Sequence, residues 1–296
     1  MADHFARRRL LLGGLASCGS AAAALPAYSA HEADTLSVET VRVSLVGLDR
    51  PLRLAQLSDI HWDGGRTIRW ELIERAAARV REARADLVVL TGDYVNREPE
   101  PIADLAPLLG TLGAPLGTFA VLGNHDACLG RSSRMIRKAL VRSGVAVLEN
   151  RWTTVAGIAL AGVGDLWNGP YEPEQVFRSL RGRLPTVLLA HNPDGFWKLG
   201  EERVDLQLSG HTHGGQVRLP LVGPVLGIHN HFKQNVPGLA HRQRGTRTGS
   251  WSGHYTHNGN RLYVSRGLGR FRRLSFGCPP EVTLIDLIPS ADRGET

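Results

Sequence analysis

The sequence predicts a mixed α/β fold in one large domain. Short apolar runs alternate with segments of helical periodicity, which is the pattern of α/β proteins. With about thirty N-terminal residues set aside as a leader, the remaining chain, 31–296, is near the upper size limit of a single hydrophobic core. No internal repeat or low-complexity linker divides it. Periodicity alone leaves the arrangement of the layers open.

The predicted strands are short apolar runs. In chain order they are VRVSLV (41–46), LRLAQLS (52–58), DLVVLT (86–91), FAVL (119–122), IALAG (158–162), TVLLA (186–190), VDLQLS (204–209), LYVS (262–265) and VTLIDL (282–287). Three segments predict helices: 68–84, 132–143 and 174–180. In the first of them Leu72, Ile73, Ala76, Val80 and Ala83 form an apolar face, with Arg and Glu elsewhere.

Five short polar motifs directly follow five of these strands. They are Asp59-Ile60-His61, Gly92-Asp93, Gly123-Asn124-His125-Asp126, His191-Asn192 and Gly210-His211-Thr212-His213. In an α/β protein the carboxyl ends of the strands line one edge where ligands bind, so these distant motifs should converge. Together they supply carboxylate, imidazole and amide ligands for divalent metals without a local CxxC or HExxH motif. The set indicates a two-metal hydrolase.

On these motifs the chain resembles the calcineurin-like metallophosphoesterases, most of all their exported bacterial branch. LSDIH, TGDY, GNHD, AHNPD and SGHTHGGQ, followed by LYVSRGLG and CPPEVTL, carry a resemblance that runs from about Arg53 to Ile288. It implies a four-layer α/β/β/α sandwich, with two mixed sheets flanked by helices. One departure is Asn96, where many relatives have a second Asp three residues after the Asp of the GD motif; that position is not a ligand in the family.

The resemblance also implies which residues bind each of two metals. Asp59, His61, Asp93 and His213 would bind one ion, and Asp93, Asn124, His191 and His211 the other. The shared Asp93 would bridge the ions, because a carboxylate can span two cations about 3.5–4 Å apart, one through each oxygen. This donor set suits manganese, zinc or iron better than calcium or magnesium. After His213 the family turns, and Gly214-Gly215 would permit that turn.

The expected reaction is hydrolysis of an anionic phosphoester, with a phosphodiester favoured. A metal-bridging water whose pKa falls from about 15.7 towards 7 would supply hydroxide for in-line attack on phosphorus. By resemblance His125 would act as general acid or charge stabiliser, with Asp126 orienting its imidazole. Two divalent cations, two carboxylates and one hydroxide leave about one positive charge, which matches the single negative charge of a diester.

Two alternatives to a phosphodiesterase stay open. The same centre could hydrolyse a pyrophosphate or phosphomonoester of a lipid-linked or nucleotide substrate, as some relatives do. A non-catalytic, metal-bound scaffold is the other alternative, because a fold does not fix a function. Such proteins often lack the GNHD histidine or metal ligands, and all of these are present here.

The N-terminus predicts export across the bacterial inner membrane. Arg7-Arg8-Arg9 precedes an apolar, small-residue stretch with almost no acidic residues, so residues 1–30 are typical of a twin-arginine signal. A disordered tail with a chance Arg run is the alternative. Cleavage after Ser29 is the favoured processing route and predicts a protein of the periplasm or cell envelope. Lipoprotein processing at Cys18 would instead tether the enzyme to the membrane.

The composition does not identify a binding partner. The formal net charge is +7, or about +5 without the three Arg and one Asp of residues 1–30. A mildly basic protein suits nucleic acid, lipid headgroups or wall polymers equally, although no nucleic-acid-binding module is recognisable. Membrane or cell-wall association and the oligomeric state stay open.

A loop-rich insertion is predicted near 223–260. It carries a basic and aromatic set that would either border the active-site mouth or form a solvated insertion: Lys233, His241, Arg242, Arg244, Arg247, Trp251 and Tyr255. Arg270, Arg272 and Arg273 form a second basic cluster near the expected site edge. Cys128 and Cys278 imply no disulfide framework.

Overall fold

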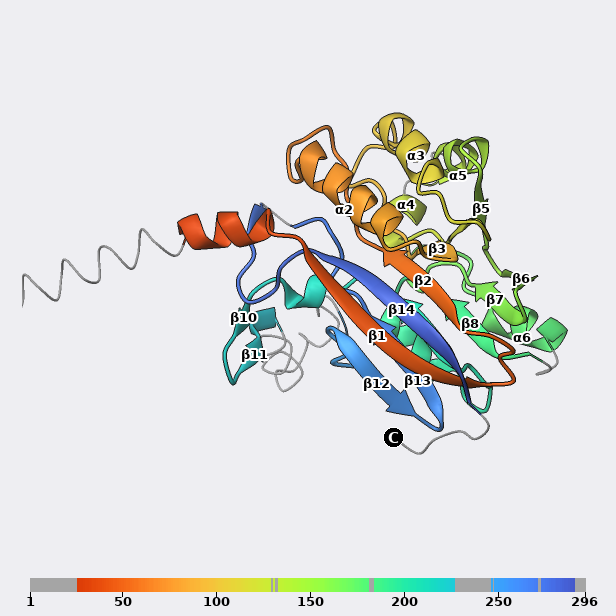
Figure 1. Cartoon of the computed structure of the whole chain (residues 1–296). Helices are drawn as coiled ribbons and strands as arrows, with labels where there is room; N and C mark the ends of the chain where they lie inside the picture. Colours follow the sequence, from red (N-terminus) through yellow and green to blue (C-terminus); the bar gives the residue numbers. More distant parts are fainter. Residues whose placement is uncertain are drawn as a thin grey trace, which may run out of the picture.

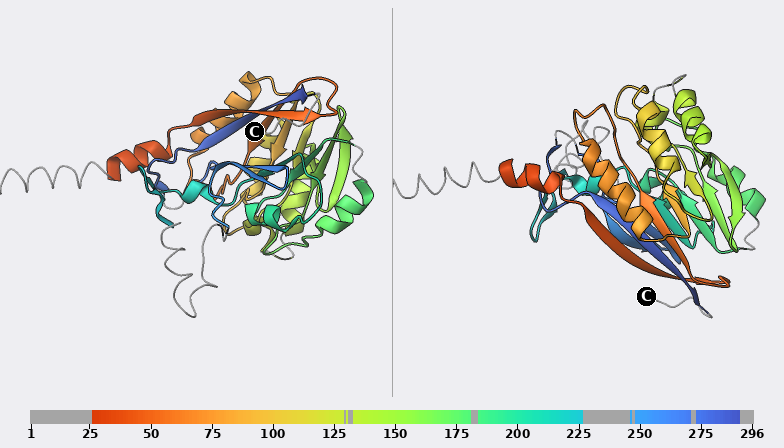
Figure 2. Two further views of the ribbon diagram at one scale, coloured as in Figure 1. Left: turned by 90° about the horizontal axis from the view of Figure 1, so that it is seen from below. Right: turned by 45° about the horizontal axis from the view of Figure 1, so that its top comes forward.

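Two six-stranded sheets pack face to face, with helices on both outer faces (Figures 1 and 2). This computed structural model describes residues 26–128, 130, 133–180, 184–226, 246, 248–270 and 273–290. The twin-arginine segment, Cys18, Arg272 and the basic residues predicted between 233 and 247 lie outside the described residues. The mixed α/β fold with two sheets flanked by helices is confirmed.

The first sheet has the strand order β1-β14-β2-β3-β4-β5. Its strands are β1 (Ser37–Val46), β14 (Glu281–Ser290), β2 (Leu52–Leu57), β3 (Leu87–Leu90), β4 (Thr118–Ala120) and β5 (Val145–Val147). Strands β2 to β5 run parallel, whereas β14 is antiparallel to β2 and parallel to β1. The outer face is covered by helices α2 (Trp70–Glu82), α3 (Ile102–Gly110) and α5 (Ser133–Arg142).

The second sheet has the strand order β12-β13-β9-β8-β7-β6. Its strands are β12 (Gly253–His257), β13 (Asn260–Val264), β9 (Leu206–Ser209), β8 (Thr186–Leu189), β7 (Ile158–Gly162) and β6 (Arg151–Val155). The four central strands are parallel, and both edge strands are antiparallel to their neighbours. Helix α6 (Pro173–Leu180) and the 3-10 helix η2 (Pro193–Lys198) pack on the side chains of its outer face.

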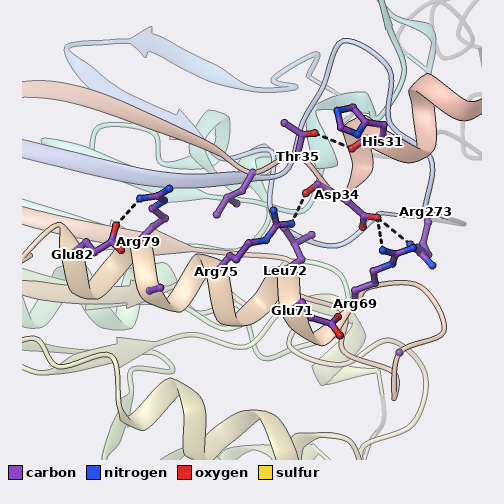
Figure 3. A pocket seen from close by; sticks show the side chains of 13 residues that line it. His31, Asp34, Thr35, Arg69, Glu71, Leu72, Arg75, Arg79, Glu82 and Arg273 are labelled. Atoms are coloured by element: carbon purple, nitrogen blue, oxygen red, sulfur yellow. Dashed lines mark hydrogen bonds and ion pairs between the residues drawn. The ribbon is translucent and has the colours of Figure 1, made fainter.

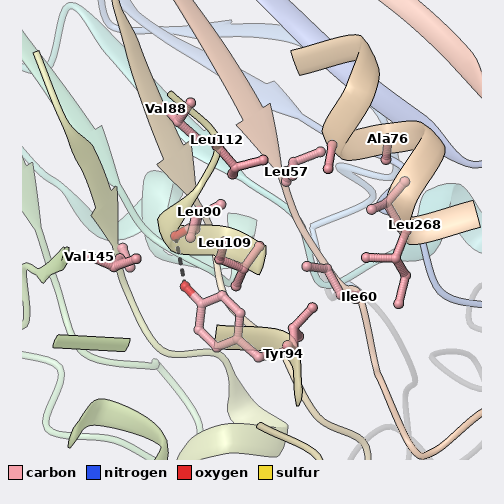
Figure 4. Close-up of a cluster of buried hydrophobic side chains, with 14 of the residues drawn as sticks. Leu57, Ile60, Ala76, Val88, Leu90, Tyr94, Leu109, Leu112, Val145 and Leu268 are labelled. Carbon is pink, nitrogen blue, oxygen red and sulfur yellow. Dashed lines mark hydrogen bonds between the residues drawn. The ribbon is translucent and has the colours of Figure 1, made fainter. Parts of the chain in front are cut away.

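Three apolar cores separate these four layers. One lies between the first sheet and its helices, where Leu57, Val88 and Leu90 meet Ala76 and Leu109 (Figure 4). The second fills the space between the sheets, and the third lies under α6 and η2. Every residue of β3, β7, β8 and β9 is buried, as expected for parallel strands covered on both faces. Each fully buried aliphatic side chain contributes roughly 1.5–3 kcal/mol, so these cores fix the relative position of the two sheets.

A helix at residues 26–33, called the N-terminal helix below, packs on the chain near Phe276. The Tyr28 ring lies edge-on to Phe276 with centroids 5.5 Å apart, and the backbone N–H of Ser275 donates to the carbonyl of Ser29 at 3.3 Å. The predicted leader boundary at residue 30 falls within this helix. Among the described residues, no helix combines the length and apolar character needed to cross a bilayer.

Candidate metal centre

All seven predicted ligands meet at the carboxyl ends of β2, β3, β4, β8 and β9, strands drawn from both sheets. The loops that carry them are hydrogen-bonded to one another: Asp59 N–H donates to Gly92 O at 2.9 Å, and Gly210 N–H to His191 O at 3.0 Å. Both carboxylate oxygens of Asp59 also accept the backbone N–H of His211, at 2.9 Å each. The ligand loops of the two sheets therefore form one unit.

The first group of donors joins the loops after β2 and β9. The Nε2 atoms of His61 and His213 lie 3.1 Å apart, and His213 Nε2 lies 3.6 Å from Asp59 Oδ1. Asp93 Oδ2 is 3.4 Å from His61 Nε2. These four side chains form the first of the two sets that the motifs predict.

The second group joins the loops after β4, β8 and β9. Asn124 Oδ1 lies 3.0 Å from His191 Nε2 and 2.6 Å from His211 Nδ1, and the two ring nitrogens are 3.3 Å apart. Asp93 Oδ2 is 3.3 Å from His191 Nε2. Asp93 thus lies beside both groups, in the position of a bridging ligand.

The possible ligand atoms of each group lie close together, an arrangement that suits a bound cation. The Nδ1 atoms of His191 and His213 face the carbonyls of Thr91 at 2.7 Å and Gly269 at 2.9 Å, so Nδ1 is the donor in each ring. Burial opposes a high pKa at His191, but the Asp93 carboxylate raises the pKa of that ring, so a metal ion would displace the proton on its Nε2. Ligands about 2.1 Å from one ion lie roughly 3.0–3.4 Å apart in octahedral or tetrahedral geometry, and most of the separations above fall in this range. The residues present therefore fit two divalent ions.

Burial keeps two of the histidine ligands neutral. It lowers the pKa of His61 to about 3 and that of His211 to about 4, so both rings are neutral, the form that binds metal. Burial alone would raise the pKa of the Asp93 carboxyl, but the neighbouring His191, His61 and His125 lower it below its ordinary value. Asp93 is therefore an anion between two groups of imidazoles.

Five of the seven ligands adopt left-handed backbone conformations. Their φ angles are 51° at Asp59, 52° at His61, 55° at Asp93, 71° at His211 and 50° at His213. This region costs a non-glycine residue on the order of 1–2 kcal/mol, and such strain gathers at functional sites. These sharp turns explain why His211 and His213 do not share a strand face. Strand β9 ends at Ser209, before both histidines, and the 3-10 helix η3 (His213–Gly215) follows.

Two motif glycines are required by close approach rather than by backbone angle. A Cβ atom at Gly123 would lie 2.2 Å from Asp93 Oδ1, and one at Gly210 would lie 2.1 Å from Asp59 Oδ2. Neither position can hold a larger residue without moving a ligand carboxylate. The Gly of GNHD and the Gly of SGHTH are thus part of the metal centre.

His125 lies at the rim of this site, on the short helix α4 (Asn124–Ala127). Its ring is 4.7 Å from that of His61 in an edge-on arrangement, and its Nδ1 faces the backbone carbonyl of Asn96 at 2.5 Å. Because a carbonyl holds the ring, the change from Asp to Asn at position 96 leaves this contact intact.

Asp126 does not orient the His125 imidazole, contrary to the expectation from the sequence. Its buried carboxylate instead accepts the backbone N–H groups of Asp93 at 2.7 Å, Tyr94 at 3.0 Å and Gly123 at 2.9 Å. Burial and the Asp93 carboxylate raise its pKa to about 8, an effect that the Gly123 N–H opposes. Through these hydrogen bonds, Asp126 fixes the backbone of Asp93, the ligand in the bridging position.

Comparison with known proteins identifies the family. The family model for the calcineurin-like phosphoesterases matches residues 52–215, more than half of the chain and the whole of the ligand set. The chain belongs to this family. Members hydrolyse phosphoesters with divalent metals, and the grouped histidines and aspartates supply the residues for such ions.

Three relatives within the calcineurin-like phosphoesterases illustrate the range of activities. The chain is 35% identical over 246 residues to phosphodiesterase YaeI of Escherichia coli, covering 80% of this chain and 83% of that protein. It is 33% identical to the uncharacterized metallophosphoesterase YkuE of Bacillus subtilis, covering 84% and 83%. It is 28% identical to the UDP-2,3-diacylglucosamine pyrophosphatase LpxG of Chlamydia muridarum, covering 79% and 83%.

The loop after β7 supplies site residues that the motifs did not predict. Trp167 is 41% exposed, and its ring lies edge-on to the ligand His211 with centroids 4.4 Å apart. Asn168 donates to the carbonyl of Asn124 at 3.2 Å, and Asp165 Oδ1 accepts the N–H groups of both Trp167 and Asn168. The GDLWN sequence of this loop matches no metal-binding motif, so its position beside the ligands becomes visible only in the folded structure.

Of the residues expected at the mouth or near the site edge, Trp251 and Arg270 lie beside the His213 turn, and Arg273 lies apart from it. Trp251 is buried, and its carbonyl accepts the Thr212 hydroxyl behind the His213 turn. Arg270 is buried as well, and it donates to the Gly269 carbonyl that also holds the His213 ring. Arg273 pairs with Asp34, away from the ligands. Trp251 and Arg270 thus hold the backbone around His213, whereas Arg273 has no part in the ligand groups.

The remaining expectations concern Tyr255 and the cysteines. The Tyr255 hydroxyl binds the backbone N–H of Trp251 at 2.9 Å, within the segment predicted as a loop-rich insertion, where β12 also forms. Cys128 and Cys278 are both free thiols. The Cys278 thiol donates to the carbonyl of His213 at 3.3 Å, so it packs against the ligand turn.

Proposed function

We propose that this protein is an exported phosphodiesterase that uses two divalent ions. The observation that carries the proposal is the pair of ligand groups sharing Asp93, with His125 at their rim. The donor set of imidazole, carboxylate and one amide favours manganese, zinc or iron. An anionic diester fits the site, because two divalent cations, two carboxylates and one hydroxide leave about one positive charge, the counterpart of the single negative charge of a diester.

Each part of the site has a defined task. When bound, the two ions supply an ionised water and stabilise the charge of the phosphoryl group. The Asn96 carbonyl accepts the Nδ1–H of His125. In its protonated form the ring carries a second N–H at Nε2, which can deliver a proton to the leaving oxygen. Asp126 holds the Asp93 backbone in place, and Trp167 provides an exposed aromatic surface beside His211 for the organic part of the substrate.

A second candidate activity is hydrolysis of a pyrophosphate bond in a lipid-linked or nucleotide substrate. The relative named UDP-2,3-diacylglucosamine pyrophosphatase supports it, whereas the more similar relative named phosphodiesterase supports a diester. Both reactions break a P–O bond at the same ligand groups, so only the substrate distinguishes them.

Export by the twin-arginine route to the periplasm or cell envelope is part of the proposal, and it rests on Arg7-Arg8-Arg9 and the apolar residues that follow. Cleavage after Ser29 would cut through the N-terminal helix and remove the Tyr28 contact with Phe276. These contacts favour processing at Cys18, upstream of the helix. The mass of the mature N-terminus decides between the two routes, and an unmodified residue 30 there would contradict lipoprotein processing.

A substrate panel tests the proposed reaction. Protein reconstituted with manganese is given bis(p-nitrophenyl) phosphate, p-nitrophenyl phosphate and a UDP-sugar at equal concentration. We expect the diester to have the highest kcat/KM, and His125→Ala to keep both metals while losing on the order of 10²-fold in kcat. Cys128→Ala, an exposed change on the same short segment, is the matched control. Preference for the UDP-sugar, or full turnover of His125→Ala, would overturn the assignment.

A further inference from the structure

Exposed apolar side chains gather at one end of the molecule. Ten large apolar side chains are exposed among the described residues, and six of them belong to this end: Tyr28, Leu219, Leu221, Val222, Val225 and Leu274. Leu221 is fully exposed and Val222 is 59% exposed, at the tip of the hairpin formed by β10 (Arg218–Leu219) and β11 (Gly223–Pro224). Isolated apolar residues are common on surfaces, but a grouped set marks an interaction site.

These six residues lie on one connected unit. The backbone N–H of Arg218, where β10 begins, donates to the carbonyl of Phe276 at 2.7 Å, and the Phe276 ring packs on Tyr28. The backbone N–H of Ser275 donates to both the carbonyl and the hydroxyl oxygen of Ser29, which lies in the N-terminal helix. Figures 1 and 2 show the hairpin and this helix at the same end of the molecule in every view.

The same end carries an excess of arginine around one carboxylate. Arg273 lies 3.1 Å and Arg69 lies 3.5 Å from Asp34 Oδ2, while Arg75 donates to the Asp34 carbonyl at 2.5 Å (Figure 3). These residues line a groove of about 1230 Å³ between the N-terminal helix and α2. Arg79 and Glu82, which pair with each other, and Glu71 also line the groove, so its arginines exceed its carboxylates by one.

The N-terminal helix begins at residue 26, so the residues that precede it join the described part of the chain at this same end. Residues 10–25 are apolar or small apart from Ser17, Cys18 and Ser20, and they follow Arg7-Arg8-Arg9. Any tether in that segment, including a lipid at Cys18, would bring a membrane towards the hairpin rather than towards the opposite end, where α5 lies.

We propose that the β10–β11 hairpin inserts its apolar tip into an anionic lipid bilayer, with Arg69, Arg75 and Arg273 facing the headgroups. Apolar side chains flanked by basic residues are what a bilayer interface binds, because burial of apolar area and attraction to anionic lipids act together. The hairpin follows the η3 turn that holds His213, and the Arg218 guanidinium donates to Gly214 O at 3.2 Å. Docking would therefore set the rim of the metal centre close to the lipid surface. The inference does not depend on the proposed reaction.

An environment-sensitive fluorophore tests insertion directly. In the full chain with Cys18→Ser and Cys128→Ser, Leu221→Cys is labelled and mixed with vesicles of phosphatidylethanolamine and phosphatidylglycerol. We expect a blue shift and quenching by nitroxide lipids. The matched control is Val141→Cys on α5, an aliphatic position that is 56% exposed at the other end of the molecule. That label should stay in water even where the N-terminal segment binds the vesicles.

Affinity gives a second readout. Leu221→Ser with Val222→Ser should weaken partitioning onto anionic vesicles by about 10-fold or more, whereas Met135→Ser with Val141→Ser should leave it unchanged. Hydrolysis of a soluble diester should be the same in both double variants, which separates docking from catalysis. A label at 221 that remains in water on bound protein, or that becomes buried without vesicles as protein concentration rises, would overturn the proposal. The second result would identify another copy of this chain as the partner.

Discussion

At the scale of single residues, the centre depends on side chains that hold other groups in place. Asp93 lies within 3.4 Å of imidazoles from two separate loops, and its own backbone is fixed by Asp126. The ligand that should bridge two ions therefore has little freedom to rotate or shift. Two consequences can be measured at this scale, one for Asp126 and one for Trp167.

Asp126→Asn should destabilise the protein and weaken metal binding. The amide would replace one acceptor oxygen with a donor, which would face the N–H groups of Asp93 or Tyr94, and a buried N–H left without an acceptor costs about 1–3 kcal/mol. Denaturant unfolding and metal titration measure both effects. His125→Ala, the neighbouring change, should leave metal affinity within a few-fold. Unaltered metal affinity in Asp126→Asn would show that the Asp93 backbone needs no such support.

Trp167→Ala should raise KM for aryl or lipid diesters by about 10-fold with a smaller effect on kcat, because the ring contacts His211 but supplies no ligand. Trp167→Phe should restore most of the loss. Steady-state kinetics with bis(p-nitrophenyl) phosphate gives both constants. A fall in kcat with KM unchanged would instead place Trp167 in the positioning of His211.

At the scale of elements, the turns after the strands matter more than the strands themselves. The loop after β9 places His211 and His213 in left-handed conformations, and Gly210 brings that loop against Asp59. Hydrogen bonds from His211 N–H to Asp59 then join a loop of one sheet to a loop of the other. The strained turns are held by these bonds, and bound ions would hold them further.

Gly210→Ala tests this close approach. Its Cβ would lie 2.0 Å from Ser58 Oγ and 2.1 Å from Asp59 Oδ2, so the Asp59 carboxylate must move and the ion held by Asp59, His61 and His213 should be lost. Gly259→Ala is the control, because its Cβ meets nothing within 4 Å and only its φ of 72° is strained. Metal analysis should show a deficit in the first variant alone. Full occupancy in Gly210→Ala would mean that the loop can relax.

The sequence predicts the buried elements well, because continuous apolar runs and an amphipathic stripe are strong signals. Strand β7 has its predicted bounds, and the helix predicted at 68–84 is found at Trp70–Glu82. Helix α3 escaped prediction because Pro107 lies inside it, and β6 and β12 because their edge positions leave them half-exposed and polar. The ligand motifs can be recognised in the sequence. The partners of Asp126 and Trp167 cannot, because they depend on contacts between distant loops.

At the scale of the whole molecule, the centre exists only because two sheets pack together. Three ligand-bearing loops follow strands of the first sheet and two follow strands of the second, with the central apolar core between them. Ions that bind the folded state alone would stabilise it by about 4 kcal/mol per site at a thousand-fold excess over Kd. The metals should therefore join the two halves of the sandwich as well as perform chemistry.

Metal stoichiometry tests the shared-aspartate centre most directly. Elemental analysis of the reconstituted full chain should give two divalent ions per chain. Asp93→Asn should lose most of both ions, because each group lies against this carboxylate, whereas His191→Ala should lose one ion and keep the other. Two ions retained by Asp93→Asn, or fewer than two in the unaltered protein, would contradict a binuclear centre organised around Asp93.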